Sequence, residues 1–119
     1  MAYFNQEMKR NMAPKVKAVL DKHGMKGSLR VVDHRKVSLT LKNGALDFGL
    51  DGRDTVDINV YWIDEHYKNS PKVLAFLREV YAVMMEGNHN NSDSQADYFD
   101  VGWYVGIKVG RWGKPYMIV

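Results

Sequence analysis

The feature that most constrains the fold is the alternation of side chains along residues 97–109, which read DYFDVGWYVGIKV. Because successive side chains of a β-strand point to opposite faces of the sheet, this pattern predicts one long strand with a single buried face. The alternate positions expected to point inward are Phe99, Val101, Trp103, Val105, Ile107 and Val109. We expect Trp103 to lie buried against a helix.

The other side of this strand is the first candidate binding face. Its two glycines leave the backbone approachable between aromatic side chains. Such a face forms either a groove for a partner or the seat of a second layer of the same domain, and the sequence leaves both interpretations open. The candidate residues are Tyr98, Asp100, Gly102, Tyr104, Gly106 and Lys108.

The spacing of apolar residues predicts two helices. The first covers residues 4–23 and ends at Gly24, where a left-handed residue would stop it, with a kink or a fresh start at Pro14. The second begins at residues 70–71, Ser-Pro, which suit the N-cap and the first helical position, and it ends at Gly87.

Turn residues and alternation predict the remaining strands. Residues 28–34 and 37–42 form a hairpin, residues 56–62 a third strand, and residues 110–116 (GRWGKPY) turn the chain into a short last strand. The order α-β-β-β-α-β-β predicts an α+β domain, with an antiparallel sheet of four to five strands and the two main helices packed on one face. A length of 119 residues fits a single globular domain, residues 1–119.

Composition excludes several kinds of site. The chain has no cysteine, which removes disulfides, thiolate zinc sites and thiol nucleophiles. It shows no leader and no apolar run near the ~20 residues of a membrane span, so we expect a soluble protein of the bacterial cytoplasm that does not contact membranes.

The sequence contains no constellation that indicates catalysis. Adjacent side chains diverge on a helix or strand, so residues 64–66 (Asp-Glu-His) make no compact metal site unaided. Residues 91–97 alternate oxygen ligands as a calcium loop does, but they lack its glycine and its closing glutamate. We therefore predict no catalytic residue, no cofactor and no metal, and whether this loop binds a cation stays open.

Charge is segregated along the chain. Residues 1–42 carry ten Lys and Arg against three Asp and Glu, residues 43–103 carry four against eleven, and residues 104–119 carry three against none. The basic ends suit contacts with phosphates, with Tyr98 or Tyr104 as a stacking surface. The candidate nucleic-acid-binding residues are Lys9, Arg10, Lys15, Lys17, Arg30, Arg35, Lys36, Arg111 and Lys114.

Four blocks of the sequence carry a resemblance: GMKGSL, LTLKNGALDF, VYWIDEH and NSDSQADYFDVGWYVGIKVGRWGKPY. In these blocks the chain resembles a group of small, mostly uncharacterised proteins encoded by tailed phages and other mobile elements of Gram-negative bacteria. The resemblance implies an accessory role in such an element and assigns no catalytic residue.

Two functions follow as hypotheses. The first is a phage or mobile-element accessory protein that acts by binding, with a host or defence protein or a second copy of itself as the partner. The alternative is a weak, sequence-nonspecific nucleic-acid-binding protein that uses the basic N-terminal third and the C-terminal tail.

Overall fold

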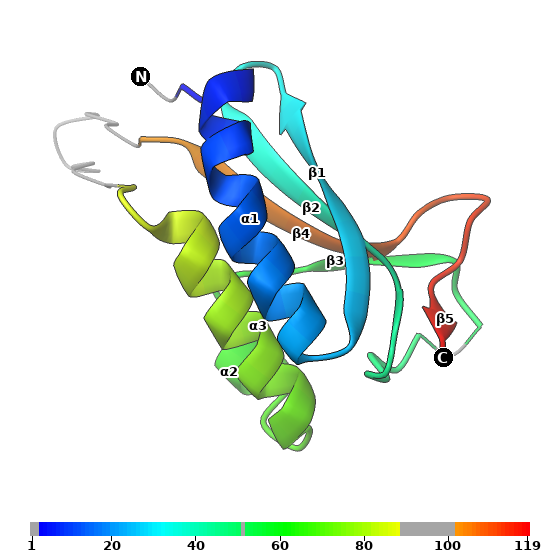
Figure 1. The fold of residues 1–119 in the computed structure, drawn as a ribbon. Helices are drawn as coiled ribbons and strands as arrows, with labels where there is room; N and C mark the ends of the chain where they lie inside the picture. Colours follow the sequence, from blue (N-terminus) through cyan, green and yellow to red (C-terminus); the bar gives the residue numbers. More distant parts are fainter. Residues whose placement is uncertain (1–2, 51, 89–101) are drawn as a thin grey trace, which may run out of the picture.

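The computed structural model describes residues 3–50, 52–88 and 102–119 (Figure 1). The elements are helices α1 (Gln6–Lys22), α2 (Ile63–His66) and α3 (Pro71–Met85), and strands β1 (Met25–Val32), β2 (Lys36–Gly44), β3 (Thr55–Ile58), β4 (Tyr104–Gly110) and β5 (Met117–Ile118). Tyr98, Asp100 and the loop 91–97 lie outside the described residues.

The sheet is mixed. Its strand order is β1-β2-β4-β3, with β5 pairing with the far end of β2. Strand β1 is antiparallel to β2 and β3 is antiparallel to β4, but β2 and β4 are parallel. The α+β class is confirmed and the purely antiparallel sheet is wrong. The reason is the long crossover through β3 and α3, which returns the chain to lie beside β2 in the same direction.

Local chemistry sets the ends of the helices. The Asn5 side chain accepts a hydrogen bond from the Met8 backbone N–H (2.8 Å) and caps α1. Gly24 follows that helix with φ +68°, as predicted. Pro14 lies inside α1, so no new helix starts there. Helix α3 begins at Ser70 and Pro71 as predicted.

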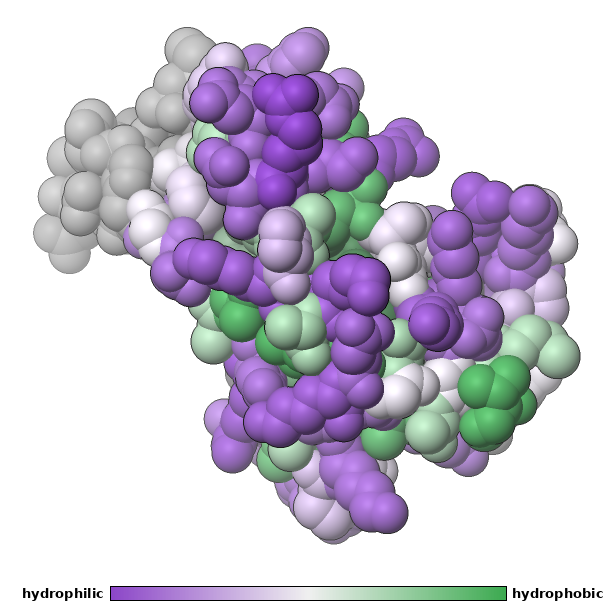
Figure 2. All heavy atoms as spheres, viewed as in Figure 1, coloured by the Kyte–Doolittle hydropathy of each residue, from purple (hydrophilic) through white to green (hydrophobic). Residues whose placement is uncertain are grey.

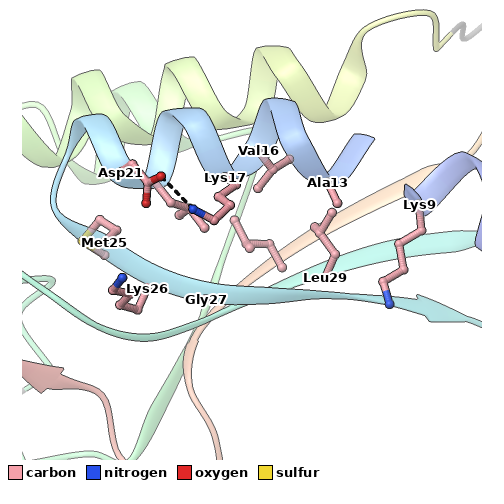
Figure 3. Close-up of a pocket in the computed structure, with 11 residues that line it drawn as sticks. Lys9, Ala13, Val16, Lys17, Asp21, Met25, Lys26, Gly27 and Leu29 are labelled. Atoms are coloured by element: carbon pink, nitrogen blue, oxygen red, sulfur yellow. Dashed lines mark hydrogen bonds and ion pairs between the residues drawn. The ribbon is translucent and has the colours of Figure 1, made fainter. Parts of the chain in front are cut away.

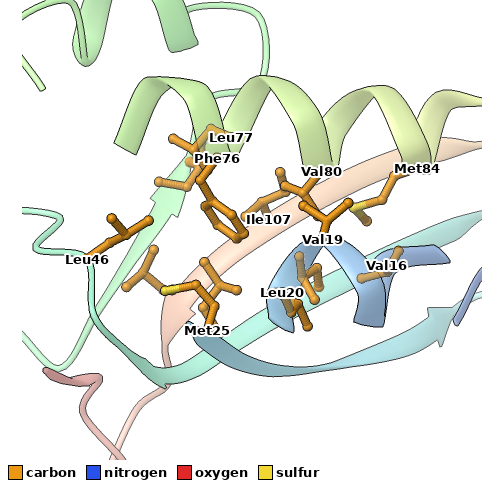
Figure 4. Close-up of a cluster of buried hydrophobic side chains, with 14 of the residues drawn as sticks. Val16, Val19, Leu20, Met25, Leu46, Phe76, Leu77, Val80, Met84 and Ile107 are labelled. Carbon is orange, nitrogen blue, oxygen red and sulfur yellow. The ribbon is translucent and has the colours of Figure 1, made fainter. Parts of the chain in front are cut away.

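The core lies between one face of the sheet and the two long helices. Helices α1 and α3 lie side by side in front of the sheet (Figure 1), and their outer surface is mainly hydrophilic (Figure 2). Apolar residues of neighbouring strands stand in direct register: Ile107 pairs with Leu39 on one side and with Ile58 on the other. Figure 4 shows side chains of both helices meeting this layer. The buried helix residues include Val16, Val19, Leu20, Phe76, Leu77, Val80 and Met84.

The predicted inward side of the fourth strand is partly confirmed. Ile107 and Val109 are buried (3% and 0% exposed), whereas Val105 is only half-buried. The strand begins at Tyr104, so Trp103 precedes it. Phe99 and Val101 lie outside the described residues.

Trp103 joins three parts of the chain although it is only half-buried. Its indole Nε1 donates to the Met84 carbonyl near the end of α3 (3.1 Å). Its ring packs edge-on against Phe4, with ring centroids 5.7 Å apart. Its backbone N–H donates to Asn88 Oδ1 (3.0 Å), and its carbonyl accepts from Asn88 Nδ2 (2.8 Å). The residue therefore fastens the entry to β4 against α3 and the N-terminal segment.

We predict that Trp103→Ala lowers the free energy of unfolding by about 3–5 kcal/mol, because it removes a large packed ring and a hydrogen bond. Trp103→Phe keeps most of the ring and loses only the indole N–H, so it should cost much less. Urea unfolding of the three proteins measures both values. A Trp103→Ala protein as stable as the wild type would show that this ring does not hold the elements together.

Candidate functional site

The second face of the sheet is the candidate site. Helices α1 and α3 lie on the opposite side (Figure 1), and within residues 3–50, 52–88 and 102–119 no helix covers this face. We call it the open face. The strand registers place on it Lys26, Ser28, Arg30, Val32, Lys36, Ser38, Thr40, Asp57, Tyr104, Gly106 and Lys108. Lys42 lies at the irregularity in the pairing of β1 with β2, and it lines a hollow together with Thr40.

The register arranges these residues in rows across the sheet. In one row Ser28 pairs with Thr40, Thr40 with Lys108, and Lys108 with Asp57. In a second row across the sheet, Lys36 of β2 pairs with Tyr104 of β4, which is 47% exposed. The Tyr104 backbone N–H also donates to the Arg35 carbonyl (2.9 Å) and so brings Arg35 to the same end of the face.

Positive charge dominates the open face. Four cations, Lys26, Arg30, Lys36 and Lys108, stand against the single carboxylate of Asp57. No ion pair joins any of the four to a carboxylate of the described residues. Unpaired charges of one sign on a continuous surface produce a potential that attracts anions.

A hollow of about 420 Å³ lies in the middle of this face. Lys36, Ser38, Asp57 and Lys108 are among the residues that line it. Gly106 forms part of its floor, and a Cβ built there would lie 2.5 Å from Lys36 Cε and 2.9 Å from Lys36 Nζ. The glycine thus lets the Lys36 side chain cross the strand. The two ammonium groups and the Ser38 hydroxyl that line this hollow, together with the single carboxylate of Asp57, leave an excess of one positive charge, which favours a phosphate.

A two-residue turn beyond β4 displays an exposed aromatic ring. The backbones of Arg111 and Lys114 exchange hydrogen bonds of 3.1 and 2.9 Å, and Trp112 at the tip is 86% exposed. The Gly113 backbone N–H donates to Asp54 Oδ2 (3.3 Å), which anchors the turn. A second hollow, of about 160 Å³ and lined in part by Thr40, Lys42, Arg111 and Lys114, connects the turn to the open face.

Trp112 is the residue that sequence reasoning missed. The sequence pattern predicts a turn for the segment GRWGKPY and offers Tyr98 or Tyr104 as the stacking surface. An available signal was the tryptophan flanked by two cations between two turn glycines. Such a turn leaves a bulky ring nowhere to be buried.

The structure divides the nine predicted nucleic-acid-binding residues. Arg30, Arg35, Lys36, Arg111 and Lys114 lie on the open face or beside it. Lys9, Arg10, Lys15 and Lys17 lie on α1, in the other layer. Two of these four are neutralised: Lys15 pairs with Glu86 (2.7 Å) and Lys17 with Asp21 (3.0 Å).

Among the described residues, five carboxylates lie in surface ion pairs: Asp21, Asp64, Glu65, Glu79 and Glu86. Asp64 Oδ1 accepts a hydrogen bond from Arg78 Nε (2.7 Å), and this bond holds the pKa of Asp64 below its usual value. Glu79 meets Lys22 (3.0 Å) and His23 (3.0 Å), and the hydrogen bond from His23 lowers the Glu79 pKa most. Among the described residues no group of three or more His, Asp and Glu is placed to hold a metal ion. No described helix has the length and apolar character to cross a bilayer.

Comparison with known proteins gives no match: no family model, no curated protein and no solved structure is similar to this chain.

The two glycines of β4 give a matched test of the open face. A Cβ at Gly106 approaches the end of the flexible Lys36 side chain and lies at an ordinary contact distance from Ser38 Oγ (3.9 Å). A Cβ at Gly110 would lie 2.3 Å from the Asp54 carbonyl oxygen, and Gly110 has φ +69°. We predict that Gly106→Val stays within about 1 kcal/mol of the wild type and that Gly110→Ala loses at least about 2 kcal/mol. Thermal melts measure both. A large loss for Gly106→Val would mean that a further layer covers this face.

Proposed function

We propose that this protein binds nucleic acid and that its open face contacts the phosphate backbone. The observation that carries the proposal is the excess of four unpaired cations over one carboxylate on a sheet face that no described helix covers. Phosphates supply most of the affinity of nonspecific nucleic-acid binding, and lysines contact them without reading sequence. We therefore assign weak, sequence-independent and salt-sensitive binding.

The aromatic residues favour single strands. Tyr104 begins β4, and Trp112 lies just beyond the other end of that strand. The seven residues of β4 span about 20 Å, a length over which several nucleotides extend. Unpaired bases stack on exposed aromatic rings while the backbone follows a cationic groove. Lys36 and Lys108 then hold phosphates between two stacking positions.

The sequence resemblance adds a biological setting to this proposal. Within it, the protein is an accessory protein of a phage or mobile element and acts on nucleic acid in the cytoplasm of the bacterial host. This setting assigns no role to any residue, and the proposal depends on the open face alone.

A second candidate function is binding of a host or defence protein. It is favoured by two exposed aromatic residues at the start of α2, where Tyr61 is 82% exposed and Trp62 is 57% exposed. Tyr61 and Tyr81 line one hollow of about 260 Å³. The pKa of Tyr81 is raised, mainly because Tyr81 is partly buried and also because Tyr61 lies nearby. Exposed aromatic clusters are frequent anchors of protein interfaces. Under this candidate, Trp62→Ala would abolish capture of a host protein and leave nucleic-acid affinity unchanged.

The phosphate contacts are tested by charge reversal on the open face. We predict that Lys36→Glu combined with Lys108→Glu weakens binding to a single-stranded oligonucleotide at least about tenfold and reduces the salt slope by about 1.4. Fluorescence anisotropy at several salt concentrations measures both quantities. The matched control reverses two exposed lysines of the helix layer, Lys68→Glu and Lys72→Glu, with the same change in net charge. Equal losses in the two proteins would show that net charge alone governs binding.

Stacking on the turn is tested separately. We predict that Trp112→Ala weakens single-strand binding about 5- to 150-fold and leaves the salt slope unchanged, because a base loses its stacking partner while the cations remain. Duplex binding should change little. Trp112→Phe should retain most of the affinity. A Trp112→Ala protein with wild-type affinity for single strands would remove this ring from the interface.

A further inference from the structure

Asp57 is the one carboxylate that the strand registers place on the open face. It stands on β3 directly opposite Lys108 of β4. Both residues line the hollow of about 420 Å³, together with Lys36 and Ser38. Although Asp57 lies beside these cations, its carboxylate forms no ion pair within residues 3–50, 52–88 and 102–119.

The carboxylate of another pocket shows the contrasting arrangement. In the groove between α1 and β1, Asp21 pairs with Lys17 at 3.0 Å (Figure 3). Each charge there is satisfied by the other, whereas the hollow of the open face keeps its groups apart. Two ammonium donors, a hydroxyl and a carboxylate acceptor line one space. This set suits a ligand that carries both a phosphate and a hydrogen-bond donor.

In a nucleic acid the donor nearest to a phosphate is the 2′-hydroxyl of ribose, because C2′ is bonded to the C3′ that carries the phosphate. DNA has no hydroxyl at this position, so a protein group that binds it distinguishes RNA from DNA. The donors of the bases lie farther away, on the edges of the rings, and the bases themselves are assigned to stacking on Tyr104 and Trp112. A carboxylate beside a bound phosphate therefore meets the sugar and not the base.

We propose that Asp57 accepts a hydrogen bond from a ribose 2′-hydroxyl and that the open face thereby prefers single-stranded RNA to single-stranded DNA. Lys36 and Lys108 hold the phosphate, and Asp57 holds the hydroxyl of the adjoining sugar. With DNA the carboxylate finds no donor, and only its repulsion of the phosphate remains. No base is read, so the preference does not depend on sequence. This inference rests on the proposed function, because it names the substrate class of the same site.

The probes are fluorescein-labelled oligoadenylates about ten nucleotides long, made as RNA, as DNA and as 2′-fluoro RNA. The 2′-fluoro sugar keeps the pucker of ribose but has no O–H donor, so it separates the hydrogen bond from the shape of the backbone. Fluorescence anisotropy at low salt, with EDTA to exclude metal bridges, measures the affinities. We expect RNA to bind at least about fivefold more tightly than DNA and 2′-fluoro RNA. Oligocytidylates should give the same ratio.

Variants locate the effect at Asp57. Asp57→Ala should bring the ratio of RNA to DNA affinity close to one and should tighten DNA binding, because the repulsion is removed. Asp57→Asn keeps an acceptor oxygen, so it should retain part of the RNA preference. The matched control, Glu7→Ala, removes an exposed carboxylate of α1 with the same change in net charge. It should leave the ratio at the wild-type value.

Three results would overturn this inference. Equal, salt-sensitive binding of RNA and DNA would remove the role of Asp57 and leave the proposed function standing. No binding of any probe at low salt would remove the proposed function and this inference together. An RNA preference that persists with 2′-fluoro RNA or in Asp57→Ala, or that follows the base instead of the sugar, would show that another feature selects RNA.

Discussion

The insertion of β4 between β2 and β3 is the constraint on which the rest of the structure depends. Ile107 and Val109 of β4 stand in register with Leu39 and Leu41 of β2 on one side, and with apolar residues of β3 on the other. Burying these continuous rows requires a cover on that face, and α1 and α3 provide it (Figure 1). Since successive side chains of a strand point to opposite faces, the strand residues that alternate with these buried ones must point to the other face of the sheet.

The same insertion creates the open face. Gly106 and Lys108 of β4 are brought beside Ser38 and Thr40 of β2, so polar residues from distant parts of the chain form one surface. Strand β4 ends at Gly110, where a Cβ would lie 2.3 Å from the Asp54 carbonyl oxygen, so this position accommodates no side chain. The turn that carries Trp112 follows directly. The cationic surface and the exposed ring are thus both consequences of how one strand enters and leaves.

Much of the fold follows from local sequence, and the rest does not. The ends of the helices were predictable at Pro71 and Gly24, because a proline at the first helical position and a left-handed glycine after the last turn act locally; the Ser70 side chain makes no capping hydrogen bond. The strand order was not, since the pairing of β2 with β4 joins residues more than sixty positions apart and the alternation within each strand is the same for parallel and antiparallel neighbours.

The candidate site was predictable only in part. Alternation placed Tyr104, Gly106 and Lys108 on one face, because that rule is local to the strand. It could not show that Lys36 crosses Gly106, nor that the α1 lysines lie in another layer, because both depend on tertiary packing. The segregation of charge along the sequence therefore predicted a larger basic surface than the structure has. The basic residues lie on two separate surfaces, the open face and the helix layer.

The most direct test of the central claim is an NMR titration of the ¹⁵N-labelled protein with a short single-stranded oligonucleotide at low salt. The account predicts that the largest shifts fall on backbone amides of the open face, at Lys36, Ser38, Gly106 and Lys108, and on the Trp112 indole, while the amides of α1 stay nearly unchanged. Shifts concentrated on α1, or no shifts on the open face at saturating oligonucleotide, would contradict it.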